Sequence, residues 1–155
     1  MARVIRWVMA GLGALLLAAC GADVGLDQHG RKVTAASLEG QWLIINYWAQ
    51  WCGPCRHEIP ELNALERSLQ GSGAQVLGVN FDGLQGEALS KASAEMGIEF
   101  RVLASDPAPR YSLPPSQVLP VTYIVAPDGR VHAQLAGEQT ADGLREKLAA
   151  ARQAQ

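Results

Sequence analysis

The sequence is poor in metal-ligating residues and has no excess of basic residues. Its 155 residues include only three cysteines, and the three histidines, His29, His57 and His132, show no paired spacing, so a four-ligand structural zinc site is not favoured. The 13 Lys and Arg are outnumbered by 15 Asp and Glu, which argues against nucleic acid as a partner. The longest apolar run, residues 7–19, is shorter than the roughly 20 residues of a comfortable membrane span. We find no repeat, no domain linker and no low-complexity stretch before the tail 149–155.

The N-terminus has the pattern of a secretory signal. Arg3 and Arg6 precede the apolar run, which has the length of a signal-peptide core. The segment Leu17-Ala18-Ala19-Cys20 resembles the bacterial lipobox, in which the cysteine becomes the lipidated first residue of the mature protein. An uncleaved anchor helix, or an ordinary signal peptide followed by a coincidental cysteine, is the alternative.

Cleavage before Cys20 would divide the chain into three parts. We expect a lipoprotein signal peptide over residues 1–19, the lipidated cysteine with a short tether over 20–25, and a single domain over 26–151. The 136 residues left after cleavage suffice for one small domain with a proper core. They hold 11 Lys and Arg against 15 Asp and Glu. With Cys20 lipidated, Cys52 and Cys55 would be the only thiols, free for function.

Two cysteines three residues apart follow a strongly apolar segment. Residues 42–48 are β-branched and aromatic, as expected of a strand buried on both faces. Pro54 suits the first turn of a helix, so Cys52 is expected at a helix N-terminus, where unpaired amides and the helix dipole favour a thiolate. Cys55 follows nearly one turn later and can attack a mixed disulfide on Cys52. We predict a redox-active pair with Cys52 as nucleophile and Cys55 as resolving thiol; half of a zinc site is the alternative.

Strands and helices alternate along the rest of the chain. Gly30 marks a turn between two short strands, and Thr140 is a predicted N-cap. The predicted elements after the first cysteine are helix 52–69 with Pro60 kinking it, strand 75–81, helix 88–96, strand 100–103, a proline-rich connection 106–117, strands 121–125 and 130–135 around the turn 126–129, and helix 141–151. This order predicts an α/β fold whose sheet is parallel in part and closed by an antiparallel pair.

The cysteine motif and two prolines carry a resemblance to a known family. Trp51-Cys52-Gly53-Pro54-Cys55, with Pro60 five residues beyond and Leu119-Pro120-Val121-Thr122-Tyr123 downstream, resembles the thioredoxin superfamily, and within it the TlpA/ResA-like thiol-disulfide oxidoreductases. The resemblance covers roughly residues 26–150. It implies a thioredoxin-like fold, in which helices flank a central mixed sheet, and a catalytic dithiol that uses no cofactor and no metal.

Two polar residues gain a role from this resemblance. In the ResA-like group the glutamate of the Cys-x-x-Cys-x-x-Glu pattern tunes the cysteines, which makes Glu58 a candidate catalytic residue exchanging a proton with Cys55. If Glu58 is partly buried, its pKa would rise; a solvated helix glutamate is the alternative. Asn46 occupies the position of a buried aspartate in thioredoxin and cannot titrate, so assisted proton transfer would fall to Glu58 or to water. Alternatively, Asn46 simply satisfies backbone groups under the sheet.

The resemblance also implies a substrate-binding set. Pro120 matches the cis-proline that faces the disulfide, which would leave main-chain groups of Leu119 free to pair with an extended substrate strand. Trp51 is expected to be partly exposed and to offer an apolar surface beside Gly53 and Pro54.

The implied activity is reduction of disulfides in exported proteins by a lipid-anchored monomer on the periplasmic side of a bacterial membrane. The resemblance implies a membrane electron donor of the DsbD or CcdA kind and cysteine-containing clients such as apocytochrome c. Gly21 after Cys20 resembles an outer-membrane sorting signal, and the choice of membrane stays open. The alternatives are a thiol oxidase or isomerase, a thioreductase dedicated to cytochrome c maturation, and a Cu(I) metallochaperone using both thiolates. Thioreductases of cytochrome c maturation usually carry an acidic residue after the cis-proline, and this sequence has none after Pro120. The Pro-x-x-x-Thr/Ser-x-x-Cys pattern of a peroxidase is absent.

Overall fold

The computed structural model describes residues 23–154. The predicted signal peptide 1–19 and the lipidation site Cys20 lie outside the described residues. Asp23–Leu26 form the first strand, β1, so regular structure begins within the stretch 20–25 that we predicted as a tether. Across residues 23–154, none of the helices combines the length and the apolar character needed to cross a bilayer.

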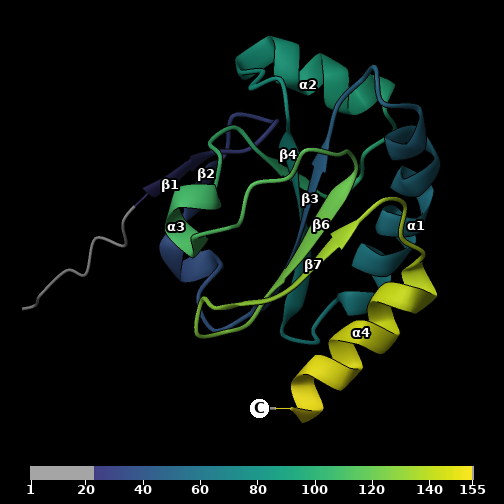
Figure 1. The fold of residues 1–155 in the computed structure, drawn as a ribbon. Coiled ribbons are helices and arrows are strands. Elements are labelled where there is room, and N and C mark those ends of the chain that lie inside the picture. The colour runs from purple at the N-terminus through teal and green to yellow at the C-terminus, as the bar shows by residue number, and fades with distance from the viewer. Residues whose placement is uncertain (1–22, 155) are drawn as a thin grey trace, which may run out of the picture.

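A five-stranded mixed sheet forms the centre of the fold (Figure 1). Its strand order is β5-β4-β3-β6-β7, with β3, β4 and β5 parallel to one another and β6 and β7 antiparallel to their neighbours. The strands are β3 (Trp42–Trp48), β4 (Ala74–Asn80), β5 (Arg101–Leu103), β6 (Val121–Val125) and β7 (Val131–Ala136). The predicted sheet, parallel in part and closed by an antiparallel pair, is thus confirmed.

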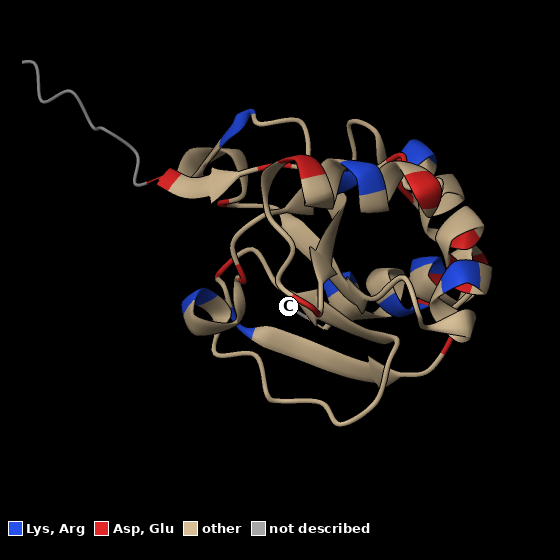
Figure 2. Cartoon of the chain, turned by 90° about the horizontal axis from the view of Figure 1, so that it is seen from above, with Lys and Arg blue, Asp and Glu red and all other residues tan. Residues whose placement is uncertain are grey.

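Helices cover both faces of this sheet (Figure 1). They are η1 (Ala35–Ser37), α1 (Gly53–Leu69), α2 (Gly86–Glu95), α3 (Ala108–Tyr111) and α4 (Ala141–Gln153). Leu62 of α1, Leu89 of α2 and Leu144 of α4 belong to one buried cluster with Ile44 of β3, so these three helices share one face. The hairpin of β1 and β2 (Lys32–Thr34), with η1 and α3, lies on the other. Both acidic and basic residues lie on α1 and on α2 (Figure 2), so neither helix carries charges of one sign alone.

Most predicted boundaries agree with the structure within two residues, and two short helices, η1 and α3, were missed. The predicted connection 106–117 contains the single-turn helix α3. It begins after Pro107 and ends at Ser112, whose φ of 51° is left-handed, and one turn is too short to show a helical period. Thr140 caps α4 as predicted, since its Oγ1 accepts from the amide of Gly143 at 3.1 Å. The turn at Gly30, with φ of 72°, is also confirmed.

Gly78 of β4 lies where the core leaves no room for a side chain. A Cβ there would lie 3.0 Å from Phe100 Cε2 and Val102 Cγ2 and 3.1 Å from Trp48 Nε1, and all three neighbours are buried. We expect Gly78→Ala to lower the free energy of unfolding by about 1–3 kcal/mol, because overpacking outweighs the entropy lost from the unfolded chain. Gly53→Ala, whose Cβ meets nothing within 4 Å, is the control in chemical denaturation. Equal stability of the two variants would contradict this account of the packing.

Candidate active site

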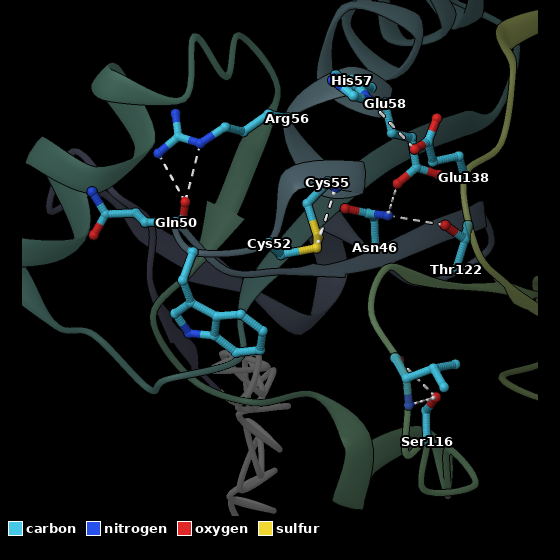
Figure 3. Close-up of a disulfide and its surroundings, with 12 residues drawn as sticks. Asn46, Gln50, Cys52, Cys55, Arg56, His57, Glu58, Ser116, Thr122 and Glu138 are labelled. Carbon is cyan, nitrogen blue, oxygen red and sulfur yellow. Dashed lines mark hydrogen bonds and ion pairs between the residues drawn. A yellow bond between two sulfur atoms is a disulfide. The ribbon is translucent and has the colours of Figure 1, made fainter.

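The two cysteines connect the end of β3 to the start of α1 (Figure 3). The amide of Cys52 donates to the Ala49 carbonyl at 3.2 Å, which turns the chain into the helix. Cys52 is the N-cap of α1, and its Sγ accepts from the amide of Cys55 at 3.2 Å. The two sulfurs form a disulfide with an S–S length of 2.05 Å. The predicted disulfide and the predicted helix N-terminus at Cys52 are therefore confirmed.

The two cysteines differ in their exposure to solvent. Cys52 is 4% exposed, whereas Cys55 is fully buried. The turn before them is held by Arg56, whose Nε and Nη2 donate to the Gln50 carbonyl at 3.1 and 2.8 Å (Figure 3). No sequence pattern indicated this clamp, because it joins a side chain to a main-chain oxygen. Any partner that reaches the disulfide must approach from the side of Cys52.

An apolar surface surrounds this side. Trp51 is 66% exposed, as predicted, and Gly53 and Pro54 are exposed beside it. The Trp51 indole donates to the two carboxylate oxygens of Asp82 at 3.2 and 3.1 Å and packs edge to face on Phe81, with ring centroids 6.3 Å apart. Phe81 and Asp82 follow β4, whose carboxyl end lies beside that of β3. The sequence analysis missed both residues, although two parallel strands ending at one edge of the sheet could have indicated them.

The side chain of Glu58, a residue of α1, is buried rather than solvated. Its side chain is 1% exposed, and it lies one turn after Cys55 in α1. Glu58 Oε2 accepts from Asn46 Nδ2 at 2.9 Å, and Oε1 accepts from the amide of Gln139 at 3.0 Å. Burial raises the pKa of Glu58 to about 7, the two hydrogen bonds oppose this rise, and the charge of Glu138 adds to it. The alternative of a solvated helix glutamate is wrong, and the expected rise of its pKa is borne out.

Asn46 joins Glu58 to the neighbouring strand. Its Nδ2 also donates to Thr122 Oγ1 of β6 at 3.0 Å, while its Oδ1 is buried with no hydrogen-bond partner among residues 23–154 (Figure 3). The alternative in which Asn46 satisfies backbone groups is wrong, because its bonds go to side chains. Thr122 was not predicted. It faces Asn46 because the two residues are paired across the antiparallel β3 and β6 strands.

The Leu119–Pro120 peptide bond is cis, as the resemblance implied. The carbonyl of Pro120 accepts from the amide of Gly137 at 2.9 Å. The amide and carbonyl of Leu119 have no hydrogen-bond partner within residues 23–154, and its side chain packs against the buried cluster that contains Cys52 and Cys55. Leu119 therefore keeps main-chain groups free close to the cysteine pair.

The histidines take no part in this arrangement. His57 is exposed on α1, and its Nδ1 lies 3.5 Å from a carboxylate oxygen of Glu138. His132 packs its ring against Trp42 in an edge-to-face contact. Over the described stretch 23–154, no three His, Cys, Asp or Glu side chains gather as a metal site would require.

Comparison with known proteins places this geometry among thiol-disulfide exchange proteins. The model of the AhpC/TSA family matches residues 18–134. The thiol-disulfide oxidoreductase ResA of Bacillus anthracis is 30% identical over 122 residues, which span 76% of this chain and 68% of that protein. The thiol:disulfide interchange protein HelX of Rhodobacter capsulatus is 32% identical over 111 residues, 71% of this chain and 60% of HelX.

Solved structures agree on the fold. A thioredoxin family thiol:disulfide interchange protein from Chlorobium tepidum superposes with a TM-score of 0.70 at 21% identity, covering 84% of this chain and 92% of that one. A secreted thiol-disulfide isomerase from Corynebacterium glutamicum gives a TM-score of 0.64 at 26% identity, covering 81% of each chain.

Proposed function

Because this chain belongs to the AhpC/TSA family and is a ResA-like thiol-disulfide oxidoreductase of the thioredoxin superfamily, we propose that it reduces disulfides in exported proteins. The observation that carries the proposal is the position of Cys52, which caps α1 with its Sγ accepting the Cys55 amide. This position favours a thiolate at the more exposed of the two cysteines.

The reaction passes two electrons from the dithiol to the client. The Cys52 thiolate attacks one sulfur of the client disulfide, that S–S bond breaks, and one client thiolate leaves and takes up a proton. The Cys55 thiolate then attacks Cys52 Sγ, the mixed disulfide breaks, and the second client thiol is released. The Cys52–Cys55 disulfide described here is the oxidised product of this cycle.

Glu58 is proposed to take the proton that Cys55 gives up when it attacks. Its position one turn after Cys55 supports this role, as does a pKa of about 7, which suits a group that exchanges a proton near neutral pH. Asn46 holds the Glu58 carboxylate from strand β3 and cannot itself supply or accept this proton.

The proposal includes a place and partners for the reaction. The lipobox-like segment ending at Cys20 supports a lipid-anchored protein on the periplasmic side of a bacterial membrane. There the oxidised pair would need a membrane electron donor of the DsbD or CcdA kind. Clients would be exported proteins with cysteine pairs, apocytochrome c among them.

Isomerisation is the second candidate, favoured by the similarity to the secreted isomerase from Corynebacterium glutamicum. An isomerase uses the same attack by Cys52 but lets the client resolve the mixed disulfide itself. The two functions differ in the reduction potential that they require.

The reduction potential of the Cys52–Cys55 pair is expected near or below about −230 mV. Gly53 and Pro54 are the two residues that also separate the cysteines of thioredoxin. The reduction potential of thioredoxin is about −270 mV, against about −120 mV for DsbA. The measurement is equilibration of the full chain carrying Cys20→Ser in thiol-disulfide buffers, with Cys52→Ser added as the control that forms no pair. A value above about −150 mV would overturn the reductase proposal and favour an oxidase or isomerase.

A further inference from the structure

A cavity of about 350 Å³ lies at the same edge of the sheet as the disulfide, but on its opposite face. Tyr47, Val121 and Tyr123 form its floor from β3 and β6 and belong to the buried cluster on that face or pack against it. The next residue of β3, Trp48, points into the cluster that contains the cysteines. The loop through Pro114, with the start of α3, forms the roof. The floor of the cavity is thus on the other face of the sheet from the cysteines.

The wall of this cavity is mostly aromatic and aliphatic. The polar ends of its two tyrosines are occupied within the protein: Tyr47 Oη donates to Asp106 Oδ1, and Tyr123 Oη donates to the Pro114 carbonyl, each at 2.5 Å. Asp106 Oδ1 also accepts the amide of Ala108 at 2.9 Å. The two tyrosine rings meet edge to face with centroids 5.7 Å apart. The wall therefore presents ring surfaces, with its hydroxyl groups already bonded.

Two residues make the cavity continuous with the surface around the disulfide. Phe81 lines the cavity and carries the exposed indole of Trp51 on its ring. Leu119 lines the cavity, packs against the cysteine cluster and keeps an amide and a carbonyl without partners in the described chain. Ser116, which Figure 3 draws among the surroundings of the disulfide but away from it, belongs to the same loop and to the cavity wall. A chain that pairs with Leu119 while its cysteine meets Cys52 thus passes the cavity mouth.

We propose that this cavity is a specificity pocket that receives an aromatic side chain of the client, from a residue within about three positions of the reacting cysteine. The inference rests on the proposed exchange at Cys52. An extended segment advances about 3.3 Å per residue, so only residues close in sequence to that cysteine can reach the pocket. An aromatic ring is the occupant that the wall fits best, because rings gain edge-to-face contacts with Tyr47, Phe81 and Tyr123 beyond the burial of apolar area.

The covalent test uses the full chain with Cys20→Ser and Cys55→Ser, in which Cys52 is the only thiol. It is mixed with short alanine peptides that contain one cysteine and are joined in pairs as symmetric disulfides. In each peptide of the series, one Phe occupies a different position among the three before and the three after the cysteine. Mass spectrometry gives the rate of mixed-disulfide formation. At one position at least, Phe is expected to raise this rate about tenfold over the all-alanine peptide, since the ring leaves water on binding.

Ala108→Trp is the variant that fills the pocket, because Ala108 lines it at the start of α3. We expect it to reduce the Phe-to-Ala ratio of rates to below about twofold. Pro109→Trp adds the same side chain at the next, exposed position outside the wall and is expected to keep the full ratio. A change in the reactivity of Cys52 affects the rates with the Phe peptide and with the all-alanine peptide equally, so it cancels in their ratio. A ratio near one at every position, or a high ratio that survives Ala108→Trp, would overturn the proposal.

A noncovalent titration separates the pocket from the exchange chemistry. The Phe peptides with serine in place of cysteine are added to the full chain while NMR signals of Tyr47, Val121 and Tyr123 are followed. Shifts at these residues that Ala108→Trp suppresses would support the pocket, and unchanged signals at saturating peptide would refute it. If no peptide forms a mixed disulfide, the proposed function fails, and this titration still decides on the pocket.

Discussion

Cys52→Ser is expected to abolish disulfide exchange, with a fall in the rate of peptide disulfide reduction of at least about a thousandfold. A serine hydroxyl does not ionise near neutral pH and does not attack disulfides, and the remaining Cys55 is fully buried. The full chain carrying Cys20→Ser serves as the parent, so that no thiol outside the pair contributes. The measurement is the release of free thiol from a fluorescent cystine peptide.

Cys55→Ser on the same parent is expected to behave differently. Cys52 keeps its place at the N-terminus of α1, so it still attacks, but no second thiol resolves the product. One client thiol is released per protein, and a stable mixed disulfide on Cys52 accumulates, visible by mass spectrometry. The contrast between the two variants tests the assignment of roles. A stable mixed disulfide in Cys52→Ser, with an inert Cys55→Ser, would show that the roles are reversed.

The elements that were predicted best are those whose sequence pattern has one structural solution. The segment 42–48 is apolar on both faces and forms β3 with the predicted bounds, because only a central strand buries both sides of such a run. The helix after Cys52 was predicted from Pro54, which suits a first turn, and it continues through Pro60 to Leu69 as one element. Local patterns were enough in both cases.

The parts of the fold that were missed owe their structure to contacts distant in sequence. The first of the two short strands predicted around Gly30, β1, begins at Asp23, within the predicted tether, and its last residue, Leu26, accepts the amide of the distant Ala104 at 2.9 Å. The helix α3 is a single turn within a proline-rich stretch, and its Tyr111 packs against the buried cluster on that face of the sheet. Sequence patterns are weak here because packing decides the conformation.

The same distinction holds for the site. Cys52 and Cys55 were predicted from their spacing, which is a local property of one helix, and Glu58 was predicted from the family resemblance that the same local motif carries. Phe81 and Asp82 come from a parallel neighbour strand, and Thr122 comes from an antiparallel one. These residues meet the cysteine region only after the sheet has formed, so the spacing within the cysteine motif could not indicate them, although the pairing of strand ends could have indicated Phe81 and Asp82.

Glu58 is expected to make stability fall as pH rises toward neutrality. Its pKa is about 7 in the folded protein, because of burial, against about 4.5 for an exposed glutamate. Between these values the folded protein holds a proton that the unfolded chain releases, so stability is full below pH 4.5 and declines up to about pH 7. Each pH unit in this window is worth about 1.4 kcal/mol, and the loss from this group amounts to about 3 kcal/mol.

Glu58→Gln removes this dependence, because an amide does not titrate. The free energy of unfolding of the variant minus that of the parent is therefore expected to rise by about 3 kcal/mol from pH 4.5 to pH 7. The measurement is chemical denaturation of both oxidised proteins at several pH values across this window. Glu61→Gln is the matched control, since Glu61 also accepts a main-chain amide, that of Ala141 at the start of α4, at 2.8 Å, but is only partly buried. A trend common to both variants would not come from the burial of Glu58.

The hydrogen bonds of Glu58→Gln change the free energy of unfolding by the same amount at every pH, so they do not alter how the difference from the parent depends on pH. The introduced glutamine can still accept from the Gln139 amide through its carbonyl oxygen, whereas its NH₂ group would face Asn46 Nδ2. The Asn46 amide can turn over, because its Oδ1 has no partner among the described residues and would then accept from the new donor. One hydrogen bond at most is lost, at a cost of about 1 kcal/mol that is the same at every pH. A difference that stays flat between pH 4.5 and 7 would therefore show that Glu58 titrates normally in the fold, and it would remove the basis for Glu58 as the proton acceptor of Cys55.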